Sequence, residues 1–487
     1  MYKEIADPVH GLIRLNKVEA ELLATKALQR LHNVHQLGLA HLVFPGANYT
    51  RHAHSIGACH NAGRMLEAIK RNTNFNLCDV EQDFAKYRII ALLHDVGHYP
   101  FSHATEHVIK DYYTAPTSGS SLFVSKNEAD PTTPAPKEPL FSDHEKLGAF
   151  IIENDPEISA VLKRNNFDPR EIAERFRMLQ PEYSTLSGVI SSDLDCDRLD
   201  YLRRTAANSG APFGSVDINF IIDQATLDDE GNFCFKPKAA RAADHLLISR
   251  FYDYMQVPFN KTAVALEWSL VECLKELFAR KVIDPSSSAM QQRILQGDDW
   301  LTFDDQYLFG RFREMRKDSD CSQLLKCHLD SISLRRPAKM LASWDTLRRK
   351  HASDAGSKSD FYSQHSKIHN SLREIVREFC DGKGIDFSRF YVWQTKVKFM
   401  KDEPDAEIGK SDPSYFAEGV HILDSTTGLA NRLFRRPDML VNTLNESYLS
   451  GLRVYYLPSN GGESSVESIR REFLEYAKTR FDNPTLC

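Results

Sequence analysis

Apolar residues in the first part of the chain recur with the spacing of helices. Between residues 54 and 72 they stand at positions 56, 59, 62, 65, 66 and 69, which gives a helix with one buried face. A second, mostly apolar run covers residues 87–95 and is followed by Gly97 and Pro100, which indicate a helix end. No alternating pattern typical of strands interrupts the first 110 residues. The N-terminal region is therefore predicted to be helical.

Helix signals continue through the middle of the chain. Asp143 and the pair Asp168-Pro169 are typical helix starts, and a long helix is predicted over residues 186–207. Residues 228–232, Asp-Asp-Glu-Gly-Asn, predict a hairpin turn, after which the helical pattern resumes over 239–282.

Strand-like segments appear only near the C-terminal end. Residues 391–399, 420–423 and 452–456 are rich in β-branched and aromatic residues and are separated by Gly and Pro. These patterns together predict a mainly α fold, in which a helical core precedes a small α+β C-terminal module. The alternating aromatic residues of the first of these segments are interpreted as one buried face of a sheet, with base stacking as the alternative.

The chain is long enough for several units, since domains average about 150 residues. We divide it into a first domain over residues 1–290 and a C-terminal region over 291–487, helical and then α+β, with oligomerisation or regulation as its candidate role. Residues 113–140 are rich in Ser, Thr, Pro and Lys and have no periodicity. They are interpreted as a mobile surface insertion in the first domain.

Composition and charge are those of an ordinary globular protein, with 42% hydrophobic and 26% charged residues. A net charge of −6 gives no overall basic field of the kind that dedicated nucleic-acid binders carry. No apolar stretch approaches the roughly 18 residues of a membrane span, and the first residues lack the order of a secretory signal. We therefore expect a cytoplasmic protein with no membrane association, whose nine cysteines are reduced.

Histidine is unevenly distributed along the chain. Of 18 histidines, those at 10, 32, 35, 41, 52, 54, 60, 94, 98, 103, 107 and 144 fall in the first 144 residues, where an even spread would place about five. Clustered imidazoles are typical of metal sites and of proton-transfer chemistry.

Four short segments place imidazole and carboxylate groups on predicted helices or at their ends. They are 51–55 (Arg-His-Ala-His-Ser), 94–98 (His-Asp-Val-Gly-His), 143–145 (Asp-His-Glu) and 193–197 (Asp-Leu-Asp-Cys-Asp). An adjacent histidine and aspartate at one helix end can reach a single ion, to which other helices add ligands. Two imidazoles with two carboxylates form a mixed site that suits Mn²⁺, Fe or Zn²⁺ better than Mg²⁺.

The order of these segments resembles a known superfamily. The string HDVGHYPFSH at 94–103 lies between Arg51-x-x-His54-Ser55 and Asp195-x-Asp197-Arg198-x-Asp200-Tyr201, as in the HD-domain phosphohydrolases. Within them the chain is most similar to the deoxynucleoside-triphosphate triphosphohydrolases, including the animal enzymes that join a sterile-alpha motif to an HD domain. Residues 7–11, 36–38 and 43–47 add to the resemblance, which runs over about residues 4–270.

The resemblance implies an HD-domain helical core that holds a divalent transition metal, Mn, Fe or Zn, with Mg accompanying the substrate phosphates. By position, the metal ligands would be His54, His94, Asp95 and Asp197. A metal held by four protein groups with open positions can activate a water and bind an α-phosphate oxygen. That chemistry fits hydrolysis at the α-phosphorus of a nucleotide.

The resemblance also assigns the groups around the substrate. His103 would protonate the departing 5′-oxygen with Glu106 as its partner carboxylate, while His98 and His144 stand at positions of phosphate contact and proton transfer. The spacing alone places residues 103 and 106 on one face of a helix. The expected substrate contacts are Gln36, Leu37, Arg51, Arg198, Tyr201, Arg250 and Lys261.

The chain departs from the family pattern at the sugar and at the activator site. Thr205 stands where the family has an aspartate that contacts the deoxyribose 3′-hydroxyl together with a glutamine, here Gln36. Pro258 stands in place of a tyrosine that packs against the sugar. At the guanine-nucleotide activator site, Ala24 and His32 occupy the positions of an acidic residue and an arginine.

These features predict a metal-dependent hydrolase that converts dNTPs into deoxynucleoside and inorganic triphosphate. Two alternatives stay open: an HD phosphohydrolase acting on another nucleotide or on an oligonucleotide phosphoester, and a nucleotide-sensing HD protein. We expect a nucleotide substrate and a homo-oligomer. The basic runs at 335–336, 348–350, 435–436 and 470–471 are interpreted as solvated faces, with nucleic-acid or regulatory-nucleotide binding as the alternative.

Overall fold

The computed structural model of the chain describes residues 3–77, 80–114, 141–177, 185–349, 358–398, 419–444, 447–459 and 465–481. The predicted insertion at 113–140 therefore lies almost entirely outside the described residues. None of the helices in the described ranges is long and apolar enough to cross a membrane.

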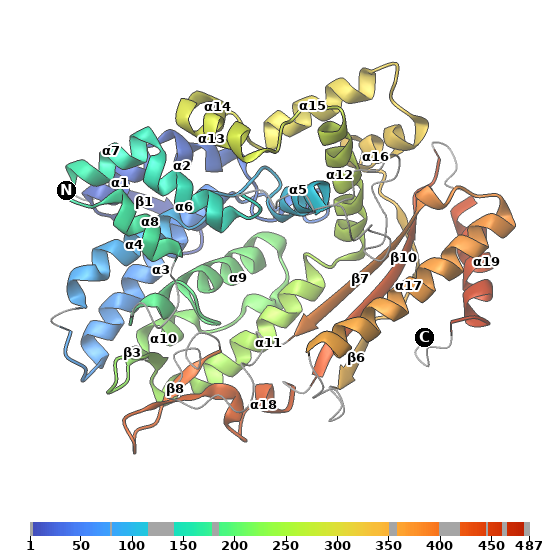
Figure 1. Cartoon of the computed structure of the whole chain (residues 1–487). Helices are drawn as coiled ribbons and strands as arrows, with labels where there is room; N and C mark the ends of the chain where they lie inside the picture. The colour runs from blue at the N-terminus through green and yellow to red at the C-terminus, as the bar shows by residue number, and fades with distance from the viewer. Residues whose placement is uncertain are drawn as a thin grey trace.

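Helices make up most of the described chain, which confirms the prediction of a mainly α fold (Figure 1). The helices of the N-terminal half are α1 (Lys17–Leu23), α2 (Lys26–Arg30), α3 (Arg51–Asn72), α4 (Phe84–Leu93), α5 (His103–Thr114), α6 (His144–Asn154), α7 (Pro156–Arg164), α8 (Pro169–Arg177), α9 (Cys196–Ser209) and α10 (Ile218–Asp223). Those of the C-terminal half are α11 (Ala240–Gln256), α12 (Lys261–Ala279), α13 (Ser287–Gln296), α14 (Asp298–Leu301), α15 (Asp305–Lys317), α16 (Gln323–Ser333), α17 (Lys358–Lys383), α18 (Leu440–Leu444) and α19 (Val466–Lys478).

The strands are short and form three sheets. They are β1 (Lys3–Asp7), β2 (Gly11–Leu15), β3 (Ala225–Leu227), β4 (Phe233–Phe235), β5 (Lys339–Ser343), β6 (Thr346–Arg349), β7 (Phe390–Lys398), β8 (His421–Leu423), β9 (Ala430–Arg432) and β10 (Ser447–Tyr456). β1 and β2 form a hairpin, and the predicted hairpin around 228–232 is present as the antiparallel pair of β3 and β4.

Helix α9 begins later than its sequence pattern suggested. The prediction of one helix over 186–207 is wrong in its first half, where only Ser187–Val189 forms a short 3₁₀ helix. The backbone of Asp195 is extended, and its side chain accepts a hydrogen bond from the Arg198 amide, so it caps α9. Gly210, at φ 74°, ends the helix in the left-handed conformation that glycine adopts easily.

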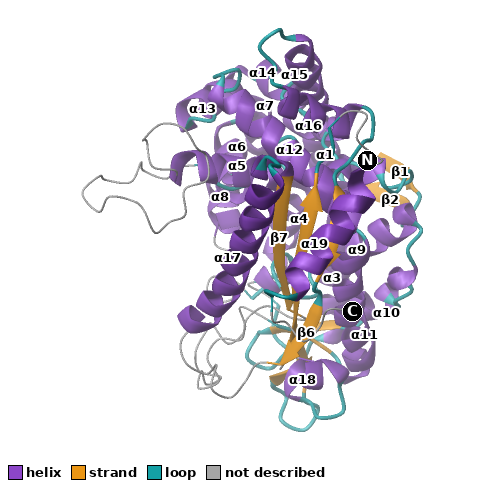
Figure 2. Cartoon of the chain, turned by 90° about the vertical axis from the view of Figure 1, so that its right-hand side faces the viewer, coloured by secondary structure: helices purple, strands orange, loops and turns teal. Residues whose placement is uncertain are grey.

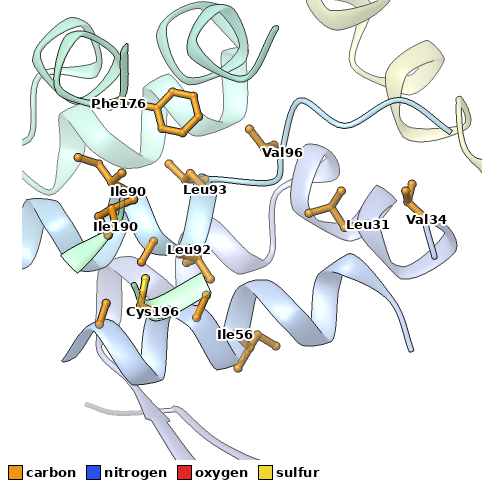
Figure 3. Packing of buried hydrophobic residues seen from close by; sticks show 14 of the residues in the cluster. Leu31, Val34, Ile56, Ile90, Leu92, Leu93, Val96, Phe176, Ile190 and Cys196 are labelled. Atoms are coloured by element: carbon orange, nitrogen blue, oxygen red, sulfur yellow. The ribbon is translucent and has the colours of Figure 1, made fainter. Parts of the chain in front are cut away.

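The main hydrophobic core is built around α3, which packs against α4 and α9. Figure 3 shows Ile56 of α3 beside Leu92 and Leu93 of α4, with Cys196 at the start of α9. All four are buried among apolar neighbours. The same cluster extends past residue 290 to Ile332 and includes residues 420–441, so apolar packing does not stop at the predicted boundary, which stays a prediction.

The C-terminal strands divide between two sheets. β10 lies at the centre of one four-stranded sheet and pairs with β5, β6 and β7, all antiparallel. One face of this sheet packs against α17 and α19, which cross it toward the viewer in Figure 2, and the other packs against α12 and α16. β8 instead returns to the first part of the chain, where it pairs with β4 in parallel.

Two aromatic residues of β7 lie on the sheet face that packs against α12 and α16. The Tyr391 ring stacks on Trp268 of α12 at 5.2 Å between ring centroids, and Trp393 packs edge-on against Phe259. The interpretation of these positions as a buried sheet face is therefore confirmed, while Phe399 lies outside the described residues.

Candidate active site

Four side chains from three parts of the chain converge on one point. The Nε2 atoms of His54 and His94 lie 3.2 Å apart, and Asp197 Oδ1 lies 2.9 Å from the first and 3.7 Å from the second. Asp95 Oδ1 is 3.3 Å from His94 Nε2. His54 comes from α3, Asp197 from the first turn of α9, and the other two from the turn after α4. His54, His94 and Asp95 can each offer one atom to a shared metal ion, and Asp197 Oδ1 adds a second carboxylate beside both imidazole nitrogens. Two imidazoles and two carboxylates form a donor set that fits a divalent transition metal.

The histidines of this set are oriented by groups behind them. His54 Nδ1 is hydrogen bonded to Asp200 Oδ2 at 2.7 Å, and His94 Nδ1 lies 2.8 Å from the Ala91 carbonyl oxygen. Each ring therefore turns its Nε2 toward the shared point, as is usual for metal-binding histidines. Burial opposes a charge on His54, but hydrogen bonds with Asp197 and Asp200 raise its pKa to about 10.

Asp200 is the centre of a buried network. Besides His54 it contacts His10 Nε2 at 2.6 Å and accepts two hydrogen bonds from Arg204, each 2.9 Å long. Arg204 reaches Asp7 with its remaining nitrogen. Gly57 of α3 faces this network, and a Cβ there would overlap the Asp200 carboxylate, so glycine is needed for α3 and α9 to approach this closely.

Arg51 connects the metal-type cluster to the turn that follows it. Its Nη1 donates to Asp95 Oδ2 at 2.6 Å and its Nε donates to Ser102 Oγ at 2.8 Å. Burial opposes ionisation of Asp95, yet the Arg51 guanidinium and the neighbouring imidazoles hold its pKa well below the usual range. Asp95 is therefore ionised at neutral pH and available as a ligand.

A second cluster surrounds Glu106. His103 Nδ1 lies 3.3 Å from one carboxylate oxygen, while His144 Nδ1 lies 3.1 Å and His98 Nδ1 3.5 Å from the other. Burial disfavours the Glu106 charge, but these imidazoles hold its pKa well below the usual range. Burial, with Arg51 and His144, lowers the pKa of His98 to about 3, so this ring is neutral. The side chain of His103 is 62% exposed and is the accessible member of the cluster.

The turn before α5 is held in an unusual conformation. Phe101 and Ser102 have backbone φ angles of 55° and 52°, in the left-handed region that residues other than glycine seldom adopt. Asp305, at the start of α15, accepts hydrogen bonds from the backbone amides of Phe101 and His35. The Arg30 guanidinium donates to the His98 carbonyl at 2.9 Å and lies over the Trp300 ring. Residues from beyond 290 thus support the turn that carries His103.

Gly97 belongs to the same turn and has a packing role that its sequence position did not indicate. The residue was interpreted as part of a helix end. In the structure, a Cβ at Gly97 would overlap the carbonyl oxygen of His144 and the backbone nitrogen of Gly148. Glycine therefore allows α6 to lie against the turn, and this contact brings His144 beside His98 with their rings stacked at 3.8 Å.

Both clusters open into one cavity of about 650 Å³. Its wall contains most of the residues singled out from the sequence: Gln36, Leu37, Arg51, His94, Asp95, His98, His103, His144, Asp197, Arg198, Tyr201 and Arg250. His54 and Glu106 lie behind the wall, in contact with residues that form it. Pro258 is also part of the wall.

Lys261 is the exception among the expected substrate contacts. It is not part of this wall, and it lines a second cavity with residues 337–343 and with Arg470 and Lys478 of α19. Lys261 is the first residue of α12, and the next residue, Thr262, also lines the second cavity. We therefore correct the expectation and leave Lys261 out of the site.

Several residues of the site are not among those expected from the sequence. Tyr49, Asp253 and Tyr254 line the cavity, and Asp305 supports it from another helix. Asp253 and Tyr254 follow Arg250 at three and four residues on α11, so helical spacing from Arg250 could have found them. Nothing local could have indicated Asp305, which is separated from His35 by 270 positions.

Comparison with known proteins agrees with this geometry. Residues 51–202 match the family model described as HD domain, and this range contains both clusters. The chain therefore carries an HD domain, as the motifs indicated.

Individual relatives extend the match to other parts of the chain. An uncharacterized protein of Mycoplasma genitalium is 32% identical over 285 residues, which are 56% of this chain and 60% of that protein. The deoxynucleoside triphosphate triphosphohydrolase SAMHD1 of Danio rerio is 41% identical over 101 residues, 21% of this chain and 16% of that enzyme. The chain spans about three fifths of the length of the Mycoplasma genitalium protein and of its homolog in Mycoplasma pneumoniae.

The fold is also found in a solved structure. A hypothetical protein from Aquifex aeolicus is similar with a TM-score of 0.66 and 24% identity, covering 97% of this chain and all of the other. The architecture of the whole chain is therefore that of an existing protein fold.

Proposed function

We propose that this chain is a metal-dependent phosphohydrolase that cleaves dNTPs into deoxynucleoside and inorganic triphosphate. One observation carries the proposal: His94, Asp95 and Asp197 of the metal-type cluster line the same cavity as His103, with His54 and Glu106 directly behind them. The 41% identity of a 101-residue segment to a deoxynucleoside triphosphate triphosphohydrolase supports the choice of substrate.

The proposed metal ligands are His54, His94, Asp95 and Asp197. Bound there, a divalent transition metal supplies an activated water and positive charge for the α-phosphate oxygens. The protein contributes fixed ligand orientation, through Asp200 behind His54 and through the Ala91 carbonyl behind His94.

His103 is the proposed general acid. Attack of water oxygen on the α-phosphorus breaks the bond to the 5′-oxygen, which leaves with a proton from His103, while the triphosphate keeps the α-phosphorus. Glu106 orients the ring through the contact at 3.3 Å. The exposure of His103 to the cavity allows this proton to reach the leaving group.

The cations on the wall fit a triphosphate. Arg198 is hydrogen bonded to Asp195, and Arg250 donates to Asp193 at 2.9 Å. Both guanidiniums are thus held in place by buried carboxylates while they line the cavity. Held cations bind and orient phosphate oxygens with little loss of side-chain freedom.

A second candidate is hydrolysis of another nucleotide or oligonucleotide phosphoester. It is favoured by one observation: the Thr205 hydroxyl lies 2.7 Å from Tyr49 Oη and the residue is not part of the cavity wall. The sugar contact that the resemblance places at this position is therefore absent from the described wall.

The test is to incubate anaerobically purified protein with Mn²⁺, Mg²⁺ or Fe²⁺ and each dNTP, each NTP or a short single strand in water enriched in ¹⁸O. Deoxynucleoside and triphosphate labelled with ¹⁸O are the expected products. Release of a nucleoside monophosphate, or turnover only of ribonucleotides or of the strand, would support the second candidate. Label in the nucleoside would contradict attack at phosphorus.

A further inference from the structure

Backbone strain is concentrated in the turn before His103. Five residues other than glycine have a positive φ in the described chain, and two of them, Phe101 and Ser102, are consecutive and directly precede His103. Strained conformations of this kind persist only where surrounding groups hold them, and they cluster at active sites. The contacts of this turn therefore indicate what sets the position of the proposed acid.

Helix α15 holds this turn at two points. Asp305, its first residue, accepts a hydrogen bond from the Phe101 amide at 2.8 Å. The Phe101 ring packs edge-on against Phe309 at 5.1 Å and stacks with Phe312 at 6.2 Å between ring centroids. Positions 305, 309 and 312 are four and three residues apart, so they lie on one face of the helix. That face fixes both the backbone and the side chain of Phe101.

The same carboxylate also holds a second segment of the cavity wall. Its other oxygen accepts a hydrogen bond from the His35 amide at 2.9 Å and lies 2.9 Å from His35 Nδ1. His35 directly precedes Gln36 and Leu37, which line the cavity. Asp305 is completely buried, so its contacts are made without competition from bulk water. The carboxylate therefore ties the Gln36 segment to the turn of His103.

A buried cation lies near this carboxylate. Arg30 donates to the His98 carbonyl at 2.9 Å and to the Phe303 carbonyl at 2.5 Å, so it links the catalytic turn to the residues just before α15. Burial lowers the pKa of Arg30 to about 9, while Asp304 and Asp305 act in the opposite direction, so the guanidinium is charged at neutral pH. This charge offsets part of the cost of burying the Asp305 carboxylate.

We propose that Asp305 is a positioning residue that aims His103 at the leaving group through the Phe101 backbone. The same carboxylate keeps the Gln36 segment in register with that acid through His35. The inference rests on the proposed function, because it concerns the proton transfer assigned to His103. It makes this chemistry depend on a residue outside the HD match at 51–202.

The test uses a leaving group that departs without an acid. In the dATP analogue whose bridging 5′-oxygen is replaced by sulfur, a thiolate leaves and needs little protonation, so the aim of His103 matters little. Asp305→Ala should lower kcat for dATP about 30-fold to 100-fold, with KM within about threefold, because a displacement of about 1 Å in a catalytic group costs rate on this scale. Turnover of the sulfur analogue should stay within about threefold of wild type.

Two further variants show whether the effect belongs to the hydrogen bonds of Asp305. Asp305→Asn keeps one carbonyl oxygen for a wall amide, so its kcat for dATP should exceed that of Asp305→Ala by at least about threefold. Asp304→Asn is the matched control, because this buried neighbour caps α15 at the Tyr307 amide, a role that asparagine also fills. It should stay within about threefold of wild type for both substrates.

Thermal melting and metal analysis verify that each variant is folded and loaded. A general loss of rigidity would lower the turnover of both substrates alike. Equal losses for dATP and the sulfur analogue in folded, metal-loaded Asp305→Ala would therefore overturn the proposal, as would a wild-type kcat for dATP in this variant.

Hydrogen exchange separates this inference from the proposed function. It is measured in peptides that cover residues 33–38 and 99–106 and needs no turnover. Asp305→Ala should raise exchange at least about fivefold in both segments, because they lose a buried hydrogen bond, while Asp304→Asn leaves both unchanged. This result supports the holding role of Asp305 even where the wild-type protein hydrolyses no dNTP. Unchanged exchange in folded Asp305→Ala overturns the inference, whatever the products of hydrolysis are.

Discussion

The two ends of the cavity differ in how their polar groups are satisfied. At the metal and phosphate end, the charged groups are paired: Arg51 with Asp95 and Ser102, Arg250 with Asp193, and His54 with Asp200, while the neutral ring of His98 keeps Nδ1 without a hydrogen bond. At the apolar end, beside Leu37 and Val257, the side-chain oxygens Gln36 Oε1 and Asp253 Oδ1 have no hydrogen-bond partner within the described chain.

The difference separates chemistry from selectivity. Charged groups that are already fixed need little reorganisation when charge develops on a phosphate, so the first end can be built independently of the base and sugar. Unpaired acceptors instead favour a ligand that supplies hydrogen-bond donors at that end.

The largest effect should follow removal of a ligand from the first end. Asp197→Ala takes away the carboxylate that lies between His54 and His94, so turnover should fall by about a thousandfold or more. Elemental analysis should show that the bound metal is lost. Asp217→Ala is the control, since it removes an exposed cap of α10 and should keep metal and activity. A folded Asp197→Ala protein with wild-type turnover would refute the assignment of the site.

A smaller loss should follow removal of the acid while the metal ligands stay intact. His103→Ala should lower kcat about 100-fold to 1,000-fold with little change in KM, because His103 acts on the leaving group rather than on binding. Metal content should stay at the wild-type value. His107→Ala, one turn later on α5 and not part of the cavity wall, should remain within threefold of wild type. Equal losses in both variants would indicate a general disturbance of the helix.

A change in the hydrogen-bond network behind His54 should lower the affinity for the metal by an intermediate amount. Asp200→Asn weakens the hydrogen bond that orients the ring, so metal affinity should fall about 10-fold to 100-fold. Titration with a competing chelator measures it. Asp7→Asn is a close control, because Asp7 also bonds Arg204 but does not touch His54. If both variants lose affinity equally, the network acts through Arg204 and not through the ring.

Much of the metal and phosphate end of the cavity was predictable from the sequence, because several of its imidazole and carboxylate groups are close together along the chain. His94 and Asp95 are adjacent at a helix end, and Asp197 and Asp200 share one face at the start of α9. Fixed local spacing therefore carries the chemistry of the site. The helical core was predictable for the same reason, since the period of apolar residues in α3 and α4 defines their buried faces.

Other features depend on contacts between distant segments. Asp305 reaches the backbone of His35 and Phe101 only after α15 has packed against the core. β8 pairs with β4 through a single register, Ile422 opposite Phe235, which no local pattern specifies. Lys261 was expected among the substrate contacts from the resemblance alone, and the structure places it in the lining of the second cavity, beside residues 337–343 that lie far away in the sequence.

The smallest effect concerns the pH dependence of stability at the apolar end. Asp253 has a folded-state pKa of about 7, against about 3.9 for an unfolded aspartate. Below pH 4 both states hold the proton, whereas between pH 4 and 7 only the folded state does, so the free energy of unfolding contributed by this group falls as pH rises through that range. Asp253→Asn removes this dependence.

The free energy of unfolding of the variant should therefore match that of wild type near pH 4.5 and exceed it above pH 7.5 by about 1–3 kcal/mol. Chemical denaturation at both pH values measures the difference. A difference that is constant with pH would mean that Asp253 is ionised in the folded protein throughout, and that the two ends of the cavity are more alike in charge than their hydrogen bonds indicate.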